Sequence, residues 1–118
     1  MSTGFPPKVR AIIEGRAEGR CEAMFSPVCN GRVEELHHRR PRGAGGTKAP
    51  AVNRAANALA VCQPCHQLIE SQRAAARAAG FLVSLHETHP AQIAVLYRNS
   101  RLVILDDFGG THDMAVPF

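Results

Sequence analysis

The sequence predicts a single small α+β domain, and three observations support this prediction. The length of 118 residues is that of one domain. Segments with helical periodicity alternate with short apolar runs of strand length. The chain has no tryptophan, one tyrosine and five phenylalanines, which predicts a thin core, while four cysteines are available to reinforce it. We therefore expect one domain over residues 1–118.

Composition excludes several broad classes of protein. Apolar residues make up 45% of the chain and charged residues 20%, which is typical of a folded globule and not of a disordered chain. No apolar run approaches the roughly 20 residues that a membrane span needs. The first seven residues also lack the hydrophobic region of a secretory signal. We expect a cytoplasmic protein with no membrane partner.

The elements follow from local patterns in chain order. Apolar residues on one helical face predict an N-terminal helix over residues 8–19, after a loose lead-in that ends in two prolines. Turn residues predict loops between Cys21 and Cys29 and over residues 41–57. The middle of the chain is then expected to hold two short strands and the clearest helix, at residues 32–38, 58–61 and 65–79.

The pattern changes after Gly80, where short apolar runs replace the helix. A strand is expected at residues 81–85, and a hairpin is expected from residues 93–97 and 101–105, with Asn99 in its turn. Residues 111–118 are expected to be frayed. This part of the chain, residues 81–110, is therefore interpreted as a small β appendage.

The basic residues are concentrated in the first half of the chain. Residues 1–60 hold ten basic and five acidic side chains, whereas residues 61–118 hold four basic and five acidic ones. Between His37 and Arg54 five cationic residues occur without a carboxylate. Such a run is either a solvated loop or a phosphate-binding surface. These five residues are Arg39, Arg40, Arg42, Lys48 and Arg54.

The four cysteines have the spacing of a metal site. Cys62 and Cys65 form a C-x-x-C pair, whose turn can bring two thiolates to one Zn²⁺, and Cys21 and Cys29 can supply the other two. A redox pair would need a βαβ setting that the pattern does not contain, and free structural cysteines are the remaining alternative. We expect a structural Zn²⁺ that supplies folding free energy to a thin core.

Two adjacent histidines end the first predicted strand. Neighbouring residues of a strand point to opposite sides, so His37 and His38 are expected to have different roles. That division suits one imidazole that binds a metal ion and one that contacts a water molecule.

The long predicted helix carries a polar stripe at its start. His66, Glu70, Arg73 and Arg77 are spaced by four, three and four residues, so they share one helical face. A surface ladder of Glu70 with the two arginines would explain three of them and leave His66 unexplained. The stripe is therefore interpreted as a second metal ligand, a candidate oxygen ligand and two cations for phosphates.

These residues together resemble a known family over about residues 19–80. In order, they are Cys21, Cys29, Glu35-Leu36-His37-His38-Arg39-Arg40-Pro41, Gly45-Gly46 and Asn57-Ala58-Leu59-Ala60-Val61-Cys62-Gln63-Pro64-Cys65-His66. This arrangement resembles the HNH endonucleases, the ββα-metal nuclease group, and in particular the small HNH proteins of bacteriophages. The resemblance implies a zinc-stapled ββα-metal (His-Me finger) core at residues 20–80, with an N-terminal helix and a C-terminal β-hairpin appendage.

The resemblance also implies roles for individual residues. His38 would be the general base that activates water. Asn57 would brace the loop and hold this base in orientation, with Asn53 as a rival for that role. His37 and His66 would hold one catalytic divalent ion (Mg²⁺, Mn²⁺ or Ni²⁺), with Glu70 as a candidate third ligand. The DNA backbone would be contacted by Arg39, Arg40, Arg42, Arg73 and Arg77.

The expected activity is hydrolysis of DNA phosphodiester bonds by an endonuclease or nickase that leaves 5′-phosphate and 3′-hydroxyl ends. The resemblance implies phage genome processing, such as packaging beside terminase subunits or homing, in the cytoplasm of a bacterial host. The alternative is a non-catalytic zinc-ribbon module that binds DNA or serves as an adaptor. His38, Asn57 and His66 discriminate between the two hypotheses, because a binding module needs none of them.

Overall fold

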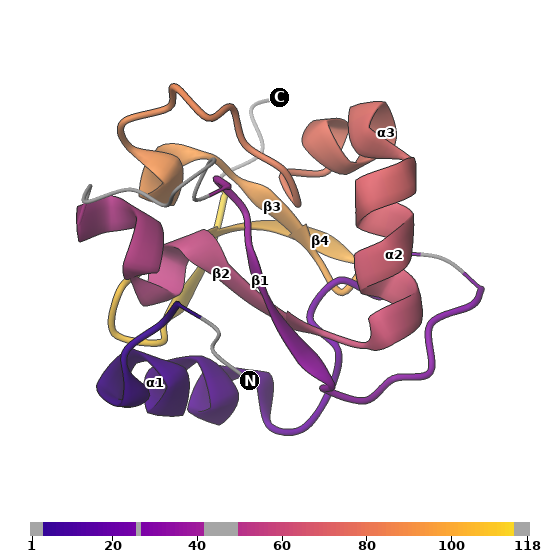
Figure 1. Cartoon of the computed structure of the whole chain (residues 1–118), viewed down its shortest axis with the longest axis horizontal. Helices are drawn as coiled ribbons and strands as arrows, with labels where there is room; N and C mark the ends of the chain where they lie inside the picture. Colours follow the sequence, from indigo (N-terminus) through magenta and orange to yellow (C-terminus); the bar gives the residue numbers. More distant parts are fainter. Residues whose placement is uncertain (1–3, 26, 42–49, 115–118) are drawn as a thin grey trace.

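The computed structural model describes residues 4–25, 27–41 and 50–114, and these form an α+β globule, as the sequence predicts (Figure 1). The helices are α1 (Pro7–Ala17), α2 (Gln63–Ser71) and α3 (Arg73–Ala78). The strands are β1 (Glu35–His38), β2 (Ala58–Val61), β3 (Val95–Tyr97), β4 (Arg101–Leu105) and β5 (Thr111–Asp113). Three single turns of 3₁₀ helix lie at Pro50–Asn53, Ala55–Asn57 and Pro90–Gln92.

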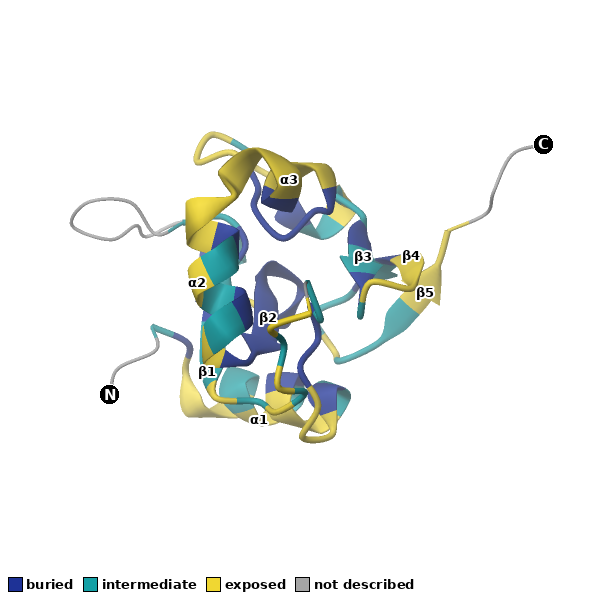
Figure 2. Ribbon diagram, turned by 90° about the vertical axis from the view of Figure 1, so that its right-hand side faces the viewer, coloured by how far each residue is buried: buried dark blue, intermediate teal, exposed yellow. Residues whose placement is uncertain are grey.

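Strand β2 lies at the centre of the fold and is buried along its whole length (Figure 2). It pairs antiparallel with β1, with Glu35 opposite Val61 and His38 opposite Ala58. Because strand side chains alternate between faces, β2 contributes to two cores. Ala58 and Ala60 belong to a cluster with Ile13 and Ala17 of α1. Leu59 and Val61 belong to a larger cluster that contains the buried cysteines and the C-terminal sheet, so β2 joins the two parts of the protein.

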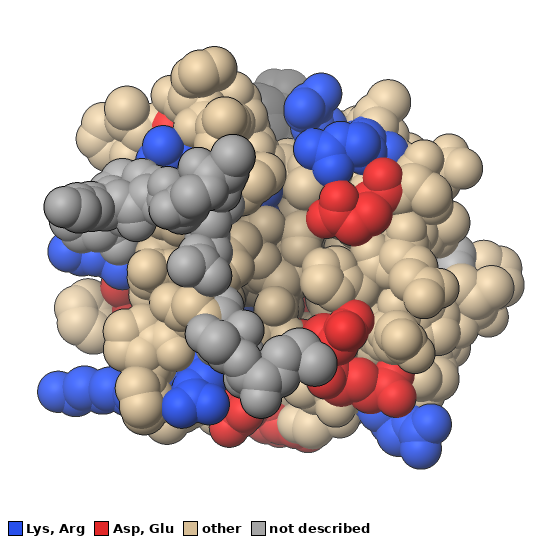
Figure 3. Space-filling view, viewed as in Figure 1, with Lys and Arg blue, Asp and Glu red and all other residues tan. Residues whose placement is uncertain are grey.

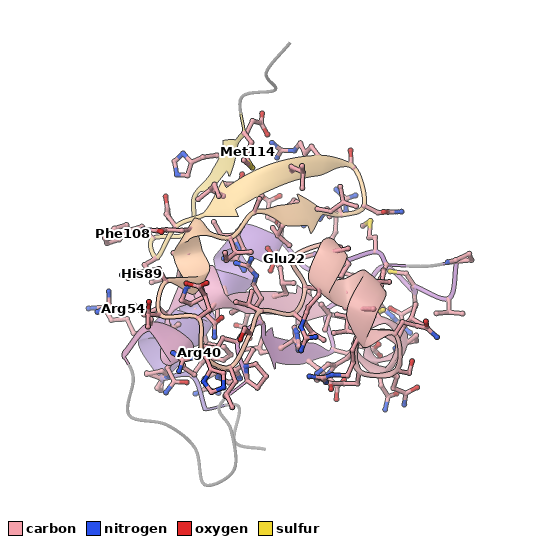
Figure 4. The ribbon with its side chains drawn as sticks, turned by 90° about the horizontal axis from the view of Figure 1, so that it is seen from above. Glu22, Arg40, Arg54, His89, Phe108 and Met114 are labelled. Carbon is pink, nitrogen blue, oxygen red and sulfur yellow. The ribbon has the colours of Figure 1, made fainter. Side chains whose placement is uncertain are left out.

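The N-terminal helix forms where the periodicity predicts it. Pro7 at its first turn has the fixed φ that starts a helix, and Glu18 and Gly19 adopt positive φ angles of 54° and 76° that end it. Arg16 extends from α1 into the interior, where it contacts Glu22 through two short bonds of 2.6 and 2.8 Å. The carboxylate of Glu22 also accepts from the Ala60 amide and the Tyr97 hydroxyl, at 2.9 and 2.7 Å. This buried network connects α1, β2 and β3 (Figure 4, where Glu22 lies in the interior).

The single helix expected at residues 65–79 is two helices in the structure. It begins earlier, at Gln63, because the Cys62 sulfur caps it by accepting from the Cys65 amide at 3.4 Å. It breaks at Gln72, whose backbone (φ −113°, ψ 59°) leaves the helical region. The alanine-rich sequence favours a continuous helix locally, but the break directs Ala76 and Ala79 into the core.

The chain turns sharply after α3. Gly80 has a φ of 79°, and a Cβ atom at that position would lie 2.0 Å from the Ala94 carbonyl oxygen. The strand expected at residues 81–85 is wrong, although Phe81 is buried. The backbone bonds of this segment go to a helix and a loop: the Phe81 amide donates to Ala76, and the Val83 amide donates to Arg39.

The C-terminal hairpin is confirmed and is larger than expected. Strands β3 and β4 pair as predicted, and Arg98 and Asn99 between them take positive φ angles of 52° and 54°. Residues 111–113, expected to be frayed, form the third strand, β5, on β4. Asp106 organises the turn between β4 and β5, because its Oδ1 accepts from the Phe108 and Gly110 amides at 2.8 and 2.7 Å. Residues 115–118 lie outside the described part of the chain.

Candidate metal centres

The four cysteines converge on one point, as the sequence predicts. The sulfur atoms of Cys21, Cys29, Cys62 and Cys65 all lie within 4.8 Å of one another, and none of the four is in a disulfide. The Cys29 and Cys62 sulfurs are 3.7 Å apart. Tetrahedral zinc with bonds of about 2.3 Å places its sulfur ligands about 3.8 Å apart, so this separation fits zinc. The cluster is a candidate structural zinc site.

The turns around the cysteines explain how a seven-residue gap still closes the cluster. Cys21 accepts from the Met24 amide at 3.5 Å, in a turn where Met24 has a φ of 44°. Cys29 accepts from the amide of Gly31 at 3.3 Å, where φ is 81°. Cys65 accepts from the Phe25 amide at 3.3 Å. Amide donors of this kind orient thiolate ligands, and both members of the first pair are held in turns.

Burial of the cysteines disfavours their thiolate form unless a cation is bound. Desolvation raises the pKa of the Cys65 thiol far above its usual range. The thiolate is the form of cysteine that binds metal, and a bound Zn²⁺ stabilises it. The donor set of four sulfurs and the distances between them therefore fit Zn²⁺ better than four free thiols in a core.

A second group of donors combines the first strand with α2. His37, His66 and Glu70 each offer a ligand atom within 4.8 Å of the others, and the two imidazole centroids are 5.0 Å apart. His37 comes from β1, whereas His66 and Glu70 lie one turn apart on α2. The antiparallel pairing of β1 with β2, followed directly by the Cys62 cap and α2, brings the three together.

Hydrogen bonds fix which nitrogen of each histidine carries the lone pair. The Nε2–H of His37 donates to the Phe81 carbonyl at 2.7 Å, which leaves the lone pair on Nδ1. The Nδ1–H of His66 donates to Glu35 at 2.9 Å, which leaves the lone pair on Nε2. Burial lowers the pKa of His37 to about 3, so this imidazole is neutral at physiological pH. Both rings are thus held as metal ligands commonly are, with the second nitrogen bonded to an oxygen.

His38 lines the same groove as this group of donors. The groove has a volume of about 360 Å³ and is bordered by Leu36, His37, His38, Pro41, His66, Glu70 and Arg73. The Nε2 atom of His38 contacts Asn53 Oδ1 at 3.0 Å, and the Phe5 ring stacks on its imidazole. The two histidines of β1 have different hydrogen-bond partners but border the same groove, although strand alternation predicts opposite sides; their different roles stay a prediction.

The structure gives different positions to the two asparagines considered in the sequence. Asn57 is fully buried and does not contact the His38 ring in the described contacts. Its Oδ1 accepts from the Arg40 amide at 2.8 Å, and its Nδ2 donates to the carbonyls of Arg40 and Val52 at 3.2 and 2.8 Å. Asn57 therefore joins the two ends of the segment 41–52, whereas Asn53 contacts the imidazole.

The predicted DNA contact by Arg39 is wrong, because its side chain is completely buried. Its guanidinium donates to the carbonyls of Gly80, Ala56 and Ile93 at 2.8, 2.9 and 2.6 Å, with a longer contact to Pro90. Desolvation lowers its pKa to about 10, so it remains charged at neutral pH. Arg39 therefore ties β1 to the segment that follows α3.

The other arginines predicted to contact DNA differ in how exposed they are. Arg73 and Arg77 are exposed on α3, and basic side chains gather over this helix beside acidic ones (Figure 3). Arg73 forms an ion pair with Glu70 at 2.8 Å, so it lies next to the candidate metal ligands. Arg40 is half-buried and donates to the Leu85 carbonyl. Arg42 lies outside the described residues.

Sequence reasoning missed three of the groups that support this site. Glu35 precedes His37 by two residues on a strand, so its place on the same side could have been inferred from the alternation. The Phe81 carbonyl and the Phe5 ring gave no such signal. Each lies more than 30 positions away in sequence from the histidine that it contacts.

Comparison with known proteins adds no assignment: no family model, no curated protein and no solved structure matches this chain. No helix in the described part of the chain is long and apolar enough to cross a membrane. The fold and the two clusters define a compact α+β protein with a four-cysteine, zinc-like site. More particularly, it carries a His/His/Glu group that could hold a second metal ion.

Proposed function

We propose that this protein is a metal-dependent DNA endonuclease or nickase of the HNH type. One observation carries the proposal: a His/His/Glu donor group and a further imidazole, His38, border a single groove. The resemblance of residues 19–80 to the small phage proteins extends the proposal to phage genome processing, with terminase subunits as candidate partners.

The donor group of His37, His66 and Glu70 fits a divalent ion in this groove. His37 and His66 would hold it through the nitrogens that their hydrogen bonds leave as acceptors, and Glu70 would add one carboxylate oxygen. When bound, the ion would supply positive charge to the scissile phosphate and to the departing oxygen. Arg73 forms an ion pair with Glu70 Oε2, so a cation lies beside the donor group and would face a phosphate bound there.

His38 supplies the base that hydrolysis requires. Its Nε2–H donates to Asn53, so Nδ1 is the nitrogen that takes a proton. A water molecule would lose that proton to Nδ1 as its oxygen bonds to phosphorus, and the bond from phosphorus to the 3′ oxygen would break. The products would carry a 5′-phosphate and, after protonation of the leaving oxygen, a 3′-hydroxyl. An imidazole with a pKa near 6.5 in its ordinary state suits this role near neutral pH.

The proposed DNA contacts are two exposed arginines of α3 and the half-buried Arg40. Arg73 borders the groove, Arg77 lies one turn further along α3, and Arg40 lies two residues after β1. Phosphate contacts of this type give affinity with little choice of sequence.

The test is cleavage of supercoiled plasmid in the presence of Mg²⁺, Mn²⁺ or Ni²⁺. We expect the wild type to convert plasmid to nicked circles before linear DNA appears, and EDTA to stop the reaction. His38→Ala should lower the rate by at least about 100-fold, in line with the loss of a general base. His89→Ala is the matched control, because His89 is exposed and does not border the groove, and its rate should be that of the wild type.

Two results would overturn the assignment: equal cleavage by the wild type and His38→Ala, or no cleavage by the wild type with any of the three metals. Retention of DNA in a gel-shift assay without cleavage would then favour the non-catalytic DNA-binding module.

A further inference from the structure

We propose that Phe5 is a positioning residue for His38. The short segment before α1 would then help to orient the proposed general base. The expected effect of Phe5 on kcat rests on the proposed nuclease function, but the contact between the two rings can be tested without activity. It gives a specific role to a segment that the sequence presents as a lead-in.

The contact between the two rings is close and nearly parallel. The ring centroids of Phe5 and His38 are 3.9 Å apart, and the ring planes differ by 9°. The Phe5 side chain is only 4% exposed, so its ring lies inside the protein, and one of its faces packs on the imidazole. A phenyl ring in this arrangement covers one whole face of the imidazole.

The Phe5 ring is held from behind by the smaller of the two cores. It belongs to the cluster that contains Ile13 of α1 and Ala58 and Ala60 of β2, and Leu36 of β1 packs against that cluster. The backbone around Phe5 is also restricted, because two prolines follow it and Pro7 starts α1. The position of the ring is therefore set by α1 and β2, which do not otherwise contact the groove.

Stacking adds a constraint that the hydrogen bond to His38 does not supply. The 3.0 Å contact with Asn53 Oδ1 fixes the position of the Nε2 atom but permits the ring to tilt about that contact. A ring stacked on the imidazole face fixes the plane. Both contacts thus restrict the direction in which Nδ1 points, which is the direction of the proton transfer in the proposed reaction. Misplacement of a reacting group by about 1 Å can lower a rate by about 100-fold.

The activity test compares three variants in nicking of a duplex oligonucleotide. Phe5→Leu keeps an apolar side chain but removes the ring, and we expect kcat to fall by about 10- to 100-fold while KM for DNA changes less than about twofold. Phe5→Tyr keeps the ring and should retain kcat within about threefold of the wild type. Ile12→Ala is the matched control, because Ile12 packs against the same core but its Cγ2 atom faces Gly109, in the turn between β4 and β5.

Ile12→Ala separates stability from positioning. We expect it to lower the melting temperature by about as much as Phe5→Leu, yet to keep the wild-type kcat at a temperature where all variants are folded. An unchanged kcat in Phe5→Leu would overturn the proposal. So would an equal fall of kcat in Ile12→Ala, because the loss would then follow stability.

Proton NMR of the His38 ring tests the geometry independently of catalysis. The phenyl ring current should shift the His38 Cδ2 and Cε1 protons upfield in the wild type, and the shift should disappear in Phe5→Leu and persist in Ile12→Ala. Unshifted His38 protons in an active wild type would refute the stacking. If the wild type cleaves no DNA with any metal, the nuclease proposal fails, and the ring-current comparison still decides whether Phe5 orients His38.

Discussion

Arg39 offers a decisive test, because the sequence and the structure assign it opposite roles. A cation in a run of five basic residues predicts a phosphate contact, and its removal would then weaken DNA binding without affecting stability. In the structure the guanidinium is fully buried and bonded to backbone carbonyls. Arg39→Met should therefore destabilise the fold itself.

The magnitude follows from the bonds that would be lost. Three of them are 2.6–2.9 Å long and bring a charged donor to a buried carbonyl. Hydrogen bonds to charged groups contribute about 1.5–3 kcal/mol each, and we use the lower value because the substitution also removes the cost of burying a charge. The expected loss is about 4–5 kcal/mol, a large part of the roughly 5–15 kcal/mol by which a domain is stable.

Urea denaturation followed by circular dichroism measures this loss in the free energy of unfolding. Arg77→Met is the matched control, because that arginine is exposed, and its stability should stay within about 0.5 kcal/mol of the wild type. The stability of Arg39→Lys should lie between those of Arg39→Met and Arg77→Met. An ammonium group keeps the charge but lacks the planar fork with which a guanidinium reaches several carbonyls. A loss below about 1 kcal/mol in Arg39→Met would refute the reasoning.

Two further predictions concern the zinc-like cluster and the C-terminal sheet. Cys62→Ser should lose both the bound metal and the stable fold, because structural zinc contributes about 10–16 kcal/mol in small domains. Elemental analysis should find one Zn²⁺ per wild-type chain, and a Cys62→Ser protein that melts like the wild type would contradict the structural role. In the turn before β5, the hydrogen bond from His112 and the amides of Gly110 and Phe108 lower the pKa of Asp106 to about 2. The turn should therefore be intact above about pH 4 and lose this stabilisation as the pH falls from 4 towards 2. The Gly110 amide shift in an NMR titration reports that midpoint, and a midpoint near the ordinary 3.8 would contradict it.

Local patterns predicted the elements whose conformation is decided locally. Strand β2 has the predicted limits, and α1 begins and ends within two residues of the predicted ones, because a proline and a glycine mark its ends. The turn between β3 and β4 was also predicted, since Asn99 tolerates the positive φ that it requires. Convergence of the four cysteines was predicted from the chemistry of their side chains, although nothing in the spacing showed the turns that close the gap.

Errors occurred where packing between distant segments decides the outcome. The alanines of residues 74–79 favour a helix wherever they are placed, so their pattern could not show the break at Gln72. Charge alone could not show that Arg39 is buried, because its partners are carbonyls, which every residue carries. Asn57 bonds to the backbones of Arg40 and Val52, which agrees with its expected place as a loop brace. The contact with His38 is made by Asn53, the rival for that part of the role, and the sequence pattern could not decide between the two.

The same long-range contacts make the C-terminal half part of the candidate site, although the sequence presents it as an appendage. The Phe81 carbonyl fixes the nitrogen through which His37 would bind a metal ion. Arg39, the first residue after β1, donates to the carbonyls of Gly80 and Ile93, and its own carbonyl accepts from the Val83 amide. These bonds place the segment after α3 directly against β1. A change in the packing of β3 and β4 would therefore act on the His37 ring through residues 80–83, without any contact between those strands and the groove.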